Sequence, residues 1–147
     1  MTTYPLAFST WGDEEIEAIQ SVIATDMYTM GKHVKQFEEE FAEYFGSPHA
    51  VMVNSGSSAN LLMLSLLKWK YKLTGDIIVP VVGWATTYFP VVQNGFRLKF
   101  VDVDPNTWNL DVEKLRDAID GNTCAIMAVN LLGNSCNYAK IKQLCEQ

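Results

Sequence analysis

Apolar residues recur at helical spacing in two segments near the start of the chain, residues 13–26 and 32–45. The apolar positions are Ile16, Ile19, Val22 and Ile23 in the first segment, and Val34, Phe37, Phe41, Tyr44 and Phe45 in the second. Gly46 follows the second segment, at the place where a helix commonly ends. The pattern predicts two consecutive amphipathic helices.

From residue 50 onward, short apolar runs of strand length alternate with segments of helix length. The predicted strands are residues 50–54, 77–79, 98–103 and 124–129, and the predicted helices are residues 57–72, 86–93, 112–119 and 138–146. This alternation implies βαβ units, and therefore an α/β fold with a mainly parallel sheet and flanking helices. The helix over residues 57–72 is apolar nearly all round, which predicts a buried central helix. Pro90 is expected to limit or kink its helix.

The predicted sheet looks unfinished. A parallel sheet needs cover on both faces, and only about four strands are predicted before the last helix. We therefore expect residues 1–147 to form one partial domain. The chain could be a fragment of a larger protein, a truncated reading frame, or a domain that a partner completes.

Composition narrows the class of protein. Apolar residues make up 48% of the chain, yet no window is long and uniform enough to span a bilayer, and the N-terminus lacks the pattern of a signal peptide. The net charge of −6 argues against nucleic acid as the main partner. The three cysteines lack CxxC spacing, which favours reduced thiols. We expect a cytoplasmic protein with neither nucleic acid nor membrane as a partner.

The most informative segment runs from a short apolar stretch through Gly56, Ser57 and Ser58 into an apolar helix. Glycine can take backbone angles that other residues resist, and serine is a good helix cap. Free N–H groups at a helix N-terminus favour an anion. The segment therefore predicts a cup for a phosphate group. The alternative is an ordinary capped turn between a strand and a helix.

Other catalytic and binding motifs find little support. There is no GxGxxG fingerprint, P-loop or GxSxG elbow, and neither His33 nor His49 has a partner at metal-ligand spacing. Asp102 and Asp104 could hold a divalent ion on a nucleotide-sugar diphosphate, as in a metal-dependent glycosyltransferase, if both face one side of a strand. The alternative, which we favour, is a polar strand end, so no metal site is predicted.

Several longer motifs occur together and in order. They are YPLAFSTW, DMYTMGKHVKQFE, NSGSSANLL, GDIIVP, GWATTYFPVVQNG, FVDVDPNTWNLD and VNLLGN. In this combination the chain resembles the N-terminal part of the PLP-dependent sugar aminotransferase and dehydratase family, which has the aspartate aminotransferase fold. The resemblance runs from Tyr4 to the last helix. Within the family it points to the GDP-4-keto-6-deoxymannose 3-dehydratase branch, and it implies part of the PLP-binding large domain.

The resemblance implies roles for particular residues. Gly56, Ser57 and Ser58 would hold the phosphate of pyridoxal 5'-phosphate or pyridoxamine 5'-phosphate, and Trp84 would stack on the cofactor ring. The loop of Met27, Tyr28, Thr29 and Met30 would border the sugar-nucleotide pocket. The alternatives are a core aromatic for Trp84 and a plain interhelical loop for residues 27–30.

The resemblance also implies an activity. The whole enzyme would remove the C3 hydroxyl of a nucleotide-linked 4-keto-6-deoxy sugar for deoxysugar and O-antigen biosynthesis, with glutamate as amino donor, and would be a homo-oligomer. The family's pyridine-pairing Asp, and its Lys or His base, lie beyond the position equivalent to Gln147. No catalytic residue is therefore assigned. The alternatives are a nucleotide-sugar aminotransferase, the metal-dependent glycosyltransferase, and an inactive fragment.

Overall fold

The computed structural model describes residues 7–146, and the chain divides into two compact units after residue 52. Tyr4, where the family resemblance begins, lies outside the described residues. Across the described part of the chain, none of the helices has the length and apolar character needed to cross a membrane.

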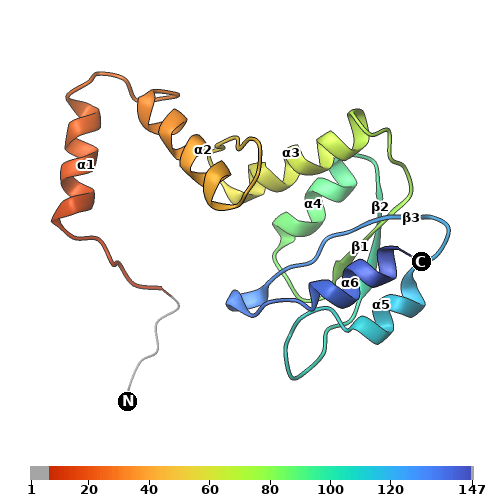
Figure 1. Cartoon of the computed structure of the whole chain (residues 1–147). Helices are drawn as coiled ribbons and strands as arrows, with labels where there is room; N and C mark the ends of the chain where they lie inside the picture. Colours follow the sequence, from red (N-terminus) through yellow and green to blue (C-terminus); the bar gives the residue numbers. More distant parts are fainter. Residues whose placement is uncertain (1–6, 147) are drawn as a thin grey trace, which may run out of the picture. The chain divides into compact units, whose positions relative to one another are not determined.

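The first unit consists of two helices, α1 (Asp13–Ile23) and α2 (Lys32–Tyr44), which confirms both predicted helices (Figure 1). The Gly12 N–H donates to the Glu15 carboxylate at 2.7 Å, and this backbone hydrogen bond lowers the pKa of Glu15. Gly46 adopts a φ of +63° just after α2, and its N–H donates to the Glu43 carbonyl at 3.1 Å. Glycine thus ends α2 in the left-handed conformation, as expected.

The strand predicted over residues 50–54 is wrong. No strand forms there, and the Val51 side chain is 71% exposed. The Met52 N–H donates to the Glu38 carboxylate at 2.8 Å. An apolar run becomes a strand only when a neighbouring strand satisfies its backbone groups, and none of the described residues pairs with this segment.

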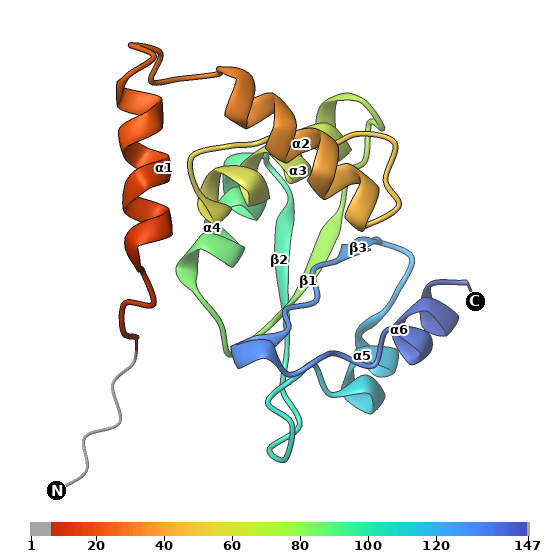
Figure 2. The ribbon, with the colours of Figure 1, turned by 60° about the vertical axis from the view of Figure 1, so that its left-hand side comes forward.

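The second unit is an α/β layer structure with a three-stranded parallel sheet in the order β2-β1-β3 (Figures 1 and 2). Its elements are α3 (Gly56–Trp69), β1 (Asp76–Pro80), α4 (Ala85–Gln93), β2 (Arg97–Val101), α5 (Val112–Ala118), β3 (Thr123–Ile126), the 3-10 turn η1 (Leu131–Gly133) and α6 (Tyr138–Cys145). The α/β class, the parallel pairing and three of the four predicted strands are confirmed.

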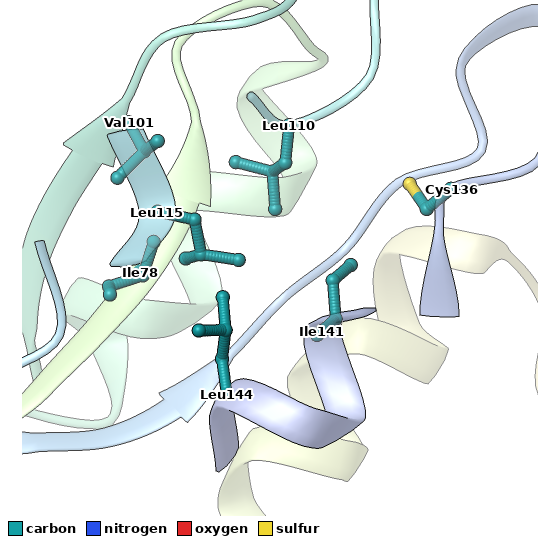
Figure 3. Close-up of a cluster of buried hydrophobic side chains, with 7 residues drawn as sticks. All are labelled: Ile78, Val101, Leu110, Leu115, Cys136, Ile141 and Leu144. Atoms are coloured by element: carbon teal, nitrogen blue, oxygen red, sulfur yellow. The ribbon is translucent and has the colours of Figure 1, made fainter. Parts of the chain in front are cut away.

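Strand β1 separates two apolar clusters. Ile77 and Val79 point to one face, where Leu64 of α3 and Val91 of α4 cover them. Ile78 points to the other face, where side chains of α5 and α6 meet it. Figure 3 shows this second cluster, formed by Ile78, Val101, Leu110, Leu115, Cys136, Ile141 and Leu144. Helices α3 and α4 therefore cover one face of the sheet, and α5 and α6 cover the opposite face.

Helix α3 is less buried than its composition predicts. Leu64 is 2% exposed and Leu67 is half-buried against the same core cluster, but most other large apolar residues of the helix are open to solvent. Their exposed fractions are 39% for Leu61, 51% for Leu62, 47% for Met63 and 47% for Leu66. The expectation of a buried central helix is therefore wrong for the described residues, because only one side of α3 packs on α4 and the sheet.

Helices α3 and α4 are joined by two side-chain hydrogen bonds. Pro90 lies inside α4 and has no N–H, so the Thr86 carbonyl four residues earlier lacks its helical donor. The Asn60 side chain donates to that carbonyl at 3.2 Å, and the Ser65 hydroxyl donates to Asn94 at 2.9 Å. The first bond joins residues near the N-termini of the two helices, and the second joins residues further along both of them. Helices α3 and α4 therefore run parallel, with their N-termini at the same end.

Two glycines of the second unit provide a matched test of the packing at the start of β1. Gly75 has a φ of +119°, and a Cβ there would overlap the carbonyl oxygen of Asn122, whereas Gly95 has a φ of +72° with nothing near its missing Cβ. Gly95→Ala should cost about 1–2 kcal/mol for the left-handed backbone alone. Gly75→Ala should cost about 2–5 kcal/mol, since overpacking adds to that strain. Urea unfolding measures both losses, and equal values would contradict the close approach.

Candidate functional site

The N-terminus of α3 presents free backbone donors. Ser55 is its N-cap, and the Ser55 hydroxyl oxygen accepts from the Ser58 N–H at 3.2 Å. Within residues 7–146 the N–H groups of Gly56 and Ser57 have no acceptor. Such unpaired donors at a helix N-terminus, together with the helix dipole, suit an anion.

The structure corrects the reason for glycine at position 56. Gly56 is the first residue of α3 and has no positive φ, so the turn does not require glycine for its backbone angle. The capping serine is Ser55 rather than Ser57 or Ser58. A Cβ at Gly56 would meet nothing within 4 Å, so the missing side chain leaves open space beside the two free N–H groups. That space fits a phosphate group close to the backbone.

A cavity adjoins this helix end. It has a volume of about 220 Å³ and lies between the first two turns of α3 and the length of α4, from Thr86 to Gln93. Its lining residues are Ser57, Ser58, Leu61, Thr86, Phe89, Pro90 and Gln93. The predicted cup residues Ser57 and Ser58 therefore face a hollow that α4 helps to form.

Trp84 is the N-cap residue of α4 and follows β1 through a short loop. Its side chain is 73% exposed, which rules out the alternative of a core aromatic in the described part of the chain. The Tyr88 hydroxyl fixes this loop by donating to the Pro80 carbonyl at 3.0 Å, and burial raises the pKa of Tyr88, which keeps the donor protonated. A Cβ at Gly83 would lie 2.9 Å from the Tyr88 hydroxyl oxygen, so glycine makes room for this bond.

The parallel arrangement of α3 and α4 brings the cup and Trp84 to the same end of the second unit. This end adjoins the carboxyl end of β1, because α4 begins directly after the loop that follows β1. Open α/β sheets bind ligands at the carboxyl ends of their strands. The arrangement offers free N–H groups for an anion, a cavity and an exposed aromatic side chain in one region.

The loop of residues 27–30 belongs to the first unit. Met27, Tyr28, Thr29 and Met30 line a cavity of about 320 Å³ between α1 and α2, to which Lys32 and His33 also contribute. The Tyr28 side chain is 66% exposed and that of Met30 is 84% exposed. The segment is therefore a hollowed surface with accessible thioether, phenol and cationic groups. Its assignment as a substrate contact stays a prediction.

The two aspartates of the glycosyltransferase alternative have internal partners. Asp102 makes an ion pair with Lys114 at 2.7 Å, and the hydrogen bond from that ammonium group lowers the pKa of Asp102. Asp104 accepts from the N–H of Asn106 at 2.7 Å in a tight turn. Within the described residues, no three His, Cys, Asp or Glu side chains gather at metal-binding distance. None of these observations favours a metal-dependent activity.

Some residues that shape the region were missed by the sequence analysis. Ser55 caps α3, and Asn60 ties α3 to α4. A serine directly before Gly56, and a proline four residues after Thr86, were the available signals. Asn130, which follows β3, has partners within the chain: its side-chain oxygen accepts from the Cys136 N–H at 2.9 Å and the Tyr138 hydroxyl at 2.8 Å.

Known proteins similar to this chain share its fold and much of its sequence. The GDP-4-keto-6-deoxy-D-mannose 3-dehydratase of Escherichia coli is 53% identical over 98% of this chain, and the match covers 38% of that protein. A solved structure of the E. coli dehydratase with bound hydrated PLP superposes with a TM-score of 0.92 at 52% identity, covering 99% of this chain and 39% of that one. A sugar aminotransferase from Micromonospora echinospora has a TM-score of 0.85 at 27% identity, covering 95% of this chain and 38% of its own.

The match extends along nearly the whole of this chain, although the chain spans only 38% of the length of its E. coli relative. The profile of one family matches residues 9–147. The incomplete parallel sheet with its flanking helices is accordingly the N-terminal portion of a PLP-dependent transferase fold. The chain belongs to the DegT/DnrJ/EryC1/StrS aminotransferase family.

Proposed function

We propose that this chain is the N-terminal part of a PLP-dependent enzyme that removes the C3 hydroxyl from a GDP-linked 4-keto-6-deoxy sugar. The observation that supports the proposal most strongly is the 53% identity to the E. coli 3-dehydratase over 98% of the chain. The aminotransferase relative from M. echinospora is more distant, at 27% identity. Glutamate as amino donor, a homo-oligomeric state and a cytoplasmic location belong to the same proposal.

The residues at the start of α3 fit the phosphate of the cofactor. The N–H groups of Gly56 and Ser57 would donate to it, and the space left by the missing Cβ of Gly56 would admit it. Ser58 faces the same cavity. Trp84, held by the loop that Tyr88 fixes, would stack on the ring. When bound, the cofactor supplies an electron sink for the reacting sugar.

The loop of residues 27–30 would contact the sugar nucleotide. Tyr28 offers a flat ring for a base, and the Met27 and Met30 thioethers offer soft apolar contacts that adapt to a ligand. The general base and the pyridine-pairing carboxylate would come from sequence beyond residue 147. The 147-residue chain alone is therefore expected to lack dehydratase and transaminase turnover.

We also propose that residues 1–147 are part of a large PLP-binding domain whose sheet continues beyond β3. Connections between parallel strands cross over with a right-handed turn. The direction in which a connection crosses the sheet therefore decides which face its helix covers, and a connection in the opposite direction places its helix on the other face. Helix α4 connects β1 to β2 on one face, and α5 connects β2 to β3 on the opposite face. Because α6 lies on the same face as α5, a parallel strand that follows α6 would lie on the outer side of β3.

The side chains at the two sheet edges agree with this direction. Strand β2 carries Arg97 and Lys99, which are paired with carboxylates, and charged side chains discourage further strand pairing. Strand β3 carries no charged residue. A groove of about 300 Å³ runs beside it, lined from α3, β1, β3 and α6 by Met63, Leu64, Ile77, Ala125, Ile126, Met127, Ala128, Tyr138 and Ile141. Since both covering layers contribute, an apolar strand would fit between them.

Hydrogen exchange tests the proposed growth of the sheet in a chimera that joins this chain to the remainder of the E. coli 3-dehydratase. The Met127 N–H donates toward β1, so by alternation those of Ile126 and Ala128 point outward. Their exchange should slow at least about ten-fold relative to the chain alone, as expected for amides that gain a ladder hydrogen bond. The outward amides of Leu98 and Phe100 on β2 serve as the control and should stay fast. Protection on β2 instead of β3 would contradict the topology.

Turnover by the same chimera tests the proposed activity. Supplied with PLP, glutamate and GDP-4-keto-6-deoxymannose, the chimera should release the 3-deoxy product, because this chain would supply the cofactor cup and the remainder would supply the base. The 147-residue chain under the same conditions should release none. Mass spectrometry of the nucleotide sugar distinguishes loss of the C3 hydroxyl from amination at C4. Because the remainder supplies the base, the outcome that would contradict the assignment of this chain to a 3-dehydratase is a folded chimera that retains the cofactor but releases no 3-deoxy product.

Cofactor retention tests the cup separately from turnover. Trp84→Ala in the chimera should weaken PMP binding about 5- to 10-fold, because one aromatic stacking contact is lost. Gly56→Val should nearly abolish binding, because the new side chain occupies the space beside the free N–H groups. Ala59→Val, at an exposed position further along α3, is the control for placing valine in this helix.

The measurement is cofactor absorbance after dialysis, with folding checked by circular dichroism. Since Gly56 has no positive φ and an unobstructed Cβ direction, Gly56→Val should fold. Full cofactor occupancy in a folded Gly56→Val chimera would disprove the cup.

A further inference from the structure

A basic and aromatic segment lies at the C-terminal end of α3, away from the proposed cofactor cup at the other end of that helix. It comprises Lys68, Trp69, Lys70, Tyr71 and Lys72, and is called the 68–72 segment below. The Trp69 side chain is 69% exposed and that of Tyr71 is 58% exposed. Within the described residues, the packing of the second unit leaves both aromatic rings open to solvent.

The charge of this segment contrasts with the rest of the chain. The net charge is −6, yet residues 44–75 contain no aspartate or glutamate. None of the segment's three lysines forms an ion pair within residues 7–146, whereas Lys99 and Lys114 do. The helix dipole favours a cation in the last turn of a helix, which accounts for Lys68 but not for the two exposed rings.

Two of the segment's three lysines lie beside its own aromatic rings, whereas the Lys68 ammonium lies 5.1 Å from the centre of the Phe96 ring, outside the segment. The Lys72 ammonium lies 6.0 Å from the centre of the Trp69 ring, and that of Lys70 lies 5.9 Å from the centre of the Tyr71 ring. Lys72 adopts a φ of +57°, so the chain turns back at this point. The turn forms a short tip at the end of α3, in which the ammonium groups of Lys70 and Lys72 lie beside exposed aromatic faces.

We propose that the 68–72 segment docks on the surface of an anionic lipid bilayer. Tryptophan and tyrosine prefer the interface between water and hydrocarbon, and lysine is attracted to anionic headgroups while its alkyl stem stays among apolar groups. A five-residue tip offers a point contact, which fits a flat surface, whereas single-stranded nucleic acid needs a basic groove that follows its backbone. The proposal departs from the sequence-based expectation of no membrane partner, which rested on the lack of a membrane-spanning window and of a signal-peptide pattern.

Flotation with lipid vesicles tests the proposal on the 147-residue chain. The chain should bind vesicles that contain about one third phosphatidylglycerol, should not bind pure phosphatidylcholine vesicles, and should bind less as salt screens the charges. The triple variant Lys68→Gln, Lys70→Gln, Lys72→Gln should bind about 100-fold more weakly, since each lysine near an anionic surface contributes about five-fold. The control variant Lys35→Gln, Lys140→Gln, Lys142→Gln has the same net charge and should bind as the unaltered chain does.

Fluorescence provides a second measurement that does not rely on the lysine variants. Lipids brominated near the headgroup should quench the tryptophan emission of the unaltered chain, and Trp69→Phe should remove most of that quenching. Trp108→Phe, at another exposed tryptophan, should leave it in place. Equal losses in the two triple variants, or no quenching in the unaltered chain, would overturn the proposal. So would a segment that binds an oligonucleotide or a second copy of the chain but no vesicle.

Discussion

The structure of the second unit depends on the complete burial of β1. Ile77, Ile78 and Val79 are each 0% exposed, and consecutive side chains of a strand point to opposite faces. Both faces of the strand must therefore be covered, and both of its edges must be paired. Burying three such side chains contributes about 1.5–3 kcal/mol each, as an upper estimate. This requirement places β2 and β3 on either side of β1. It also places α3 and α4 on one face of the sheet, and α5 and α6 on the other.

The same strand also positions the candidate site. At its carboxyl end, the Pro80 carbonyl accepts the Tyr88 hydroxyl, which fixes the loop that leads to Trp84. Helix α4 then begins, and α3 lies parallel to it. The free N–H groups of α3 reach the same region through helix packing rather than through the sheet. The geometry of the candidate site therefore depends on the packing contact between α3 and α4.

Elements with clear apolar periodicity were predicted correctly from the sequence. The predictions failed where the structure or burial of an element depends on neighbouring elements. The helices and β1 follow from apolar spacing. The 50–54 segment has the composition of a strand, but pairing decides whether a strand forms, and composition does not reveal the partner. Helix α3 is apolar on several sides. This composition indicates that other residues could cover its surface, but it does not indicate that the described residues do so.

The candidate site was likewise predicted only in part, because its geometry also depends on neighbouring elements. A serine-rich turn before an apolar helix indicates a helix N-terminus with free donors, and the structure has one. The pattern could not distinguish a glycine needed for its backbone angle from a glycine that leaves open space, and Gly56 has no positive φ and nothing near its missing Cβ. The roles proposed for Trp84 and for residues 27–30 rest on family resemblance, because exposure and loop geometry have no signature in a single sequence.

The missing N–H of Pro90 leads to a hydrogen bond between two helices. Without an N–H, this residue leaves the Thr86 carbonyl to the side chain of Asn60 on the neighbouring helix. With a residue that has an N–H at position 90, the Thr86 carbonyl would gain a helical donor, and loss of the Asn60 hydrogen bond would then cost less stability. The contributions of positions 60 and 90 to stability are therefore coupled, although the two residues lie thirty positions apart in the sequence.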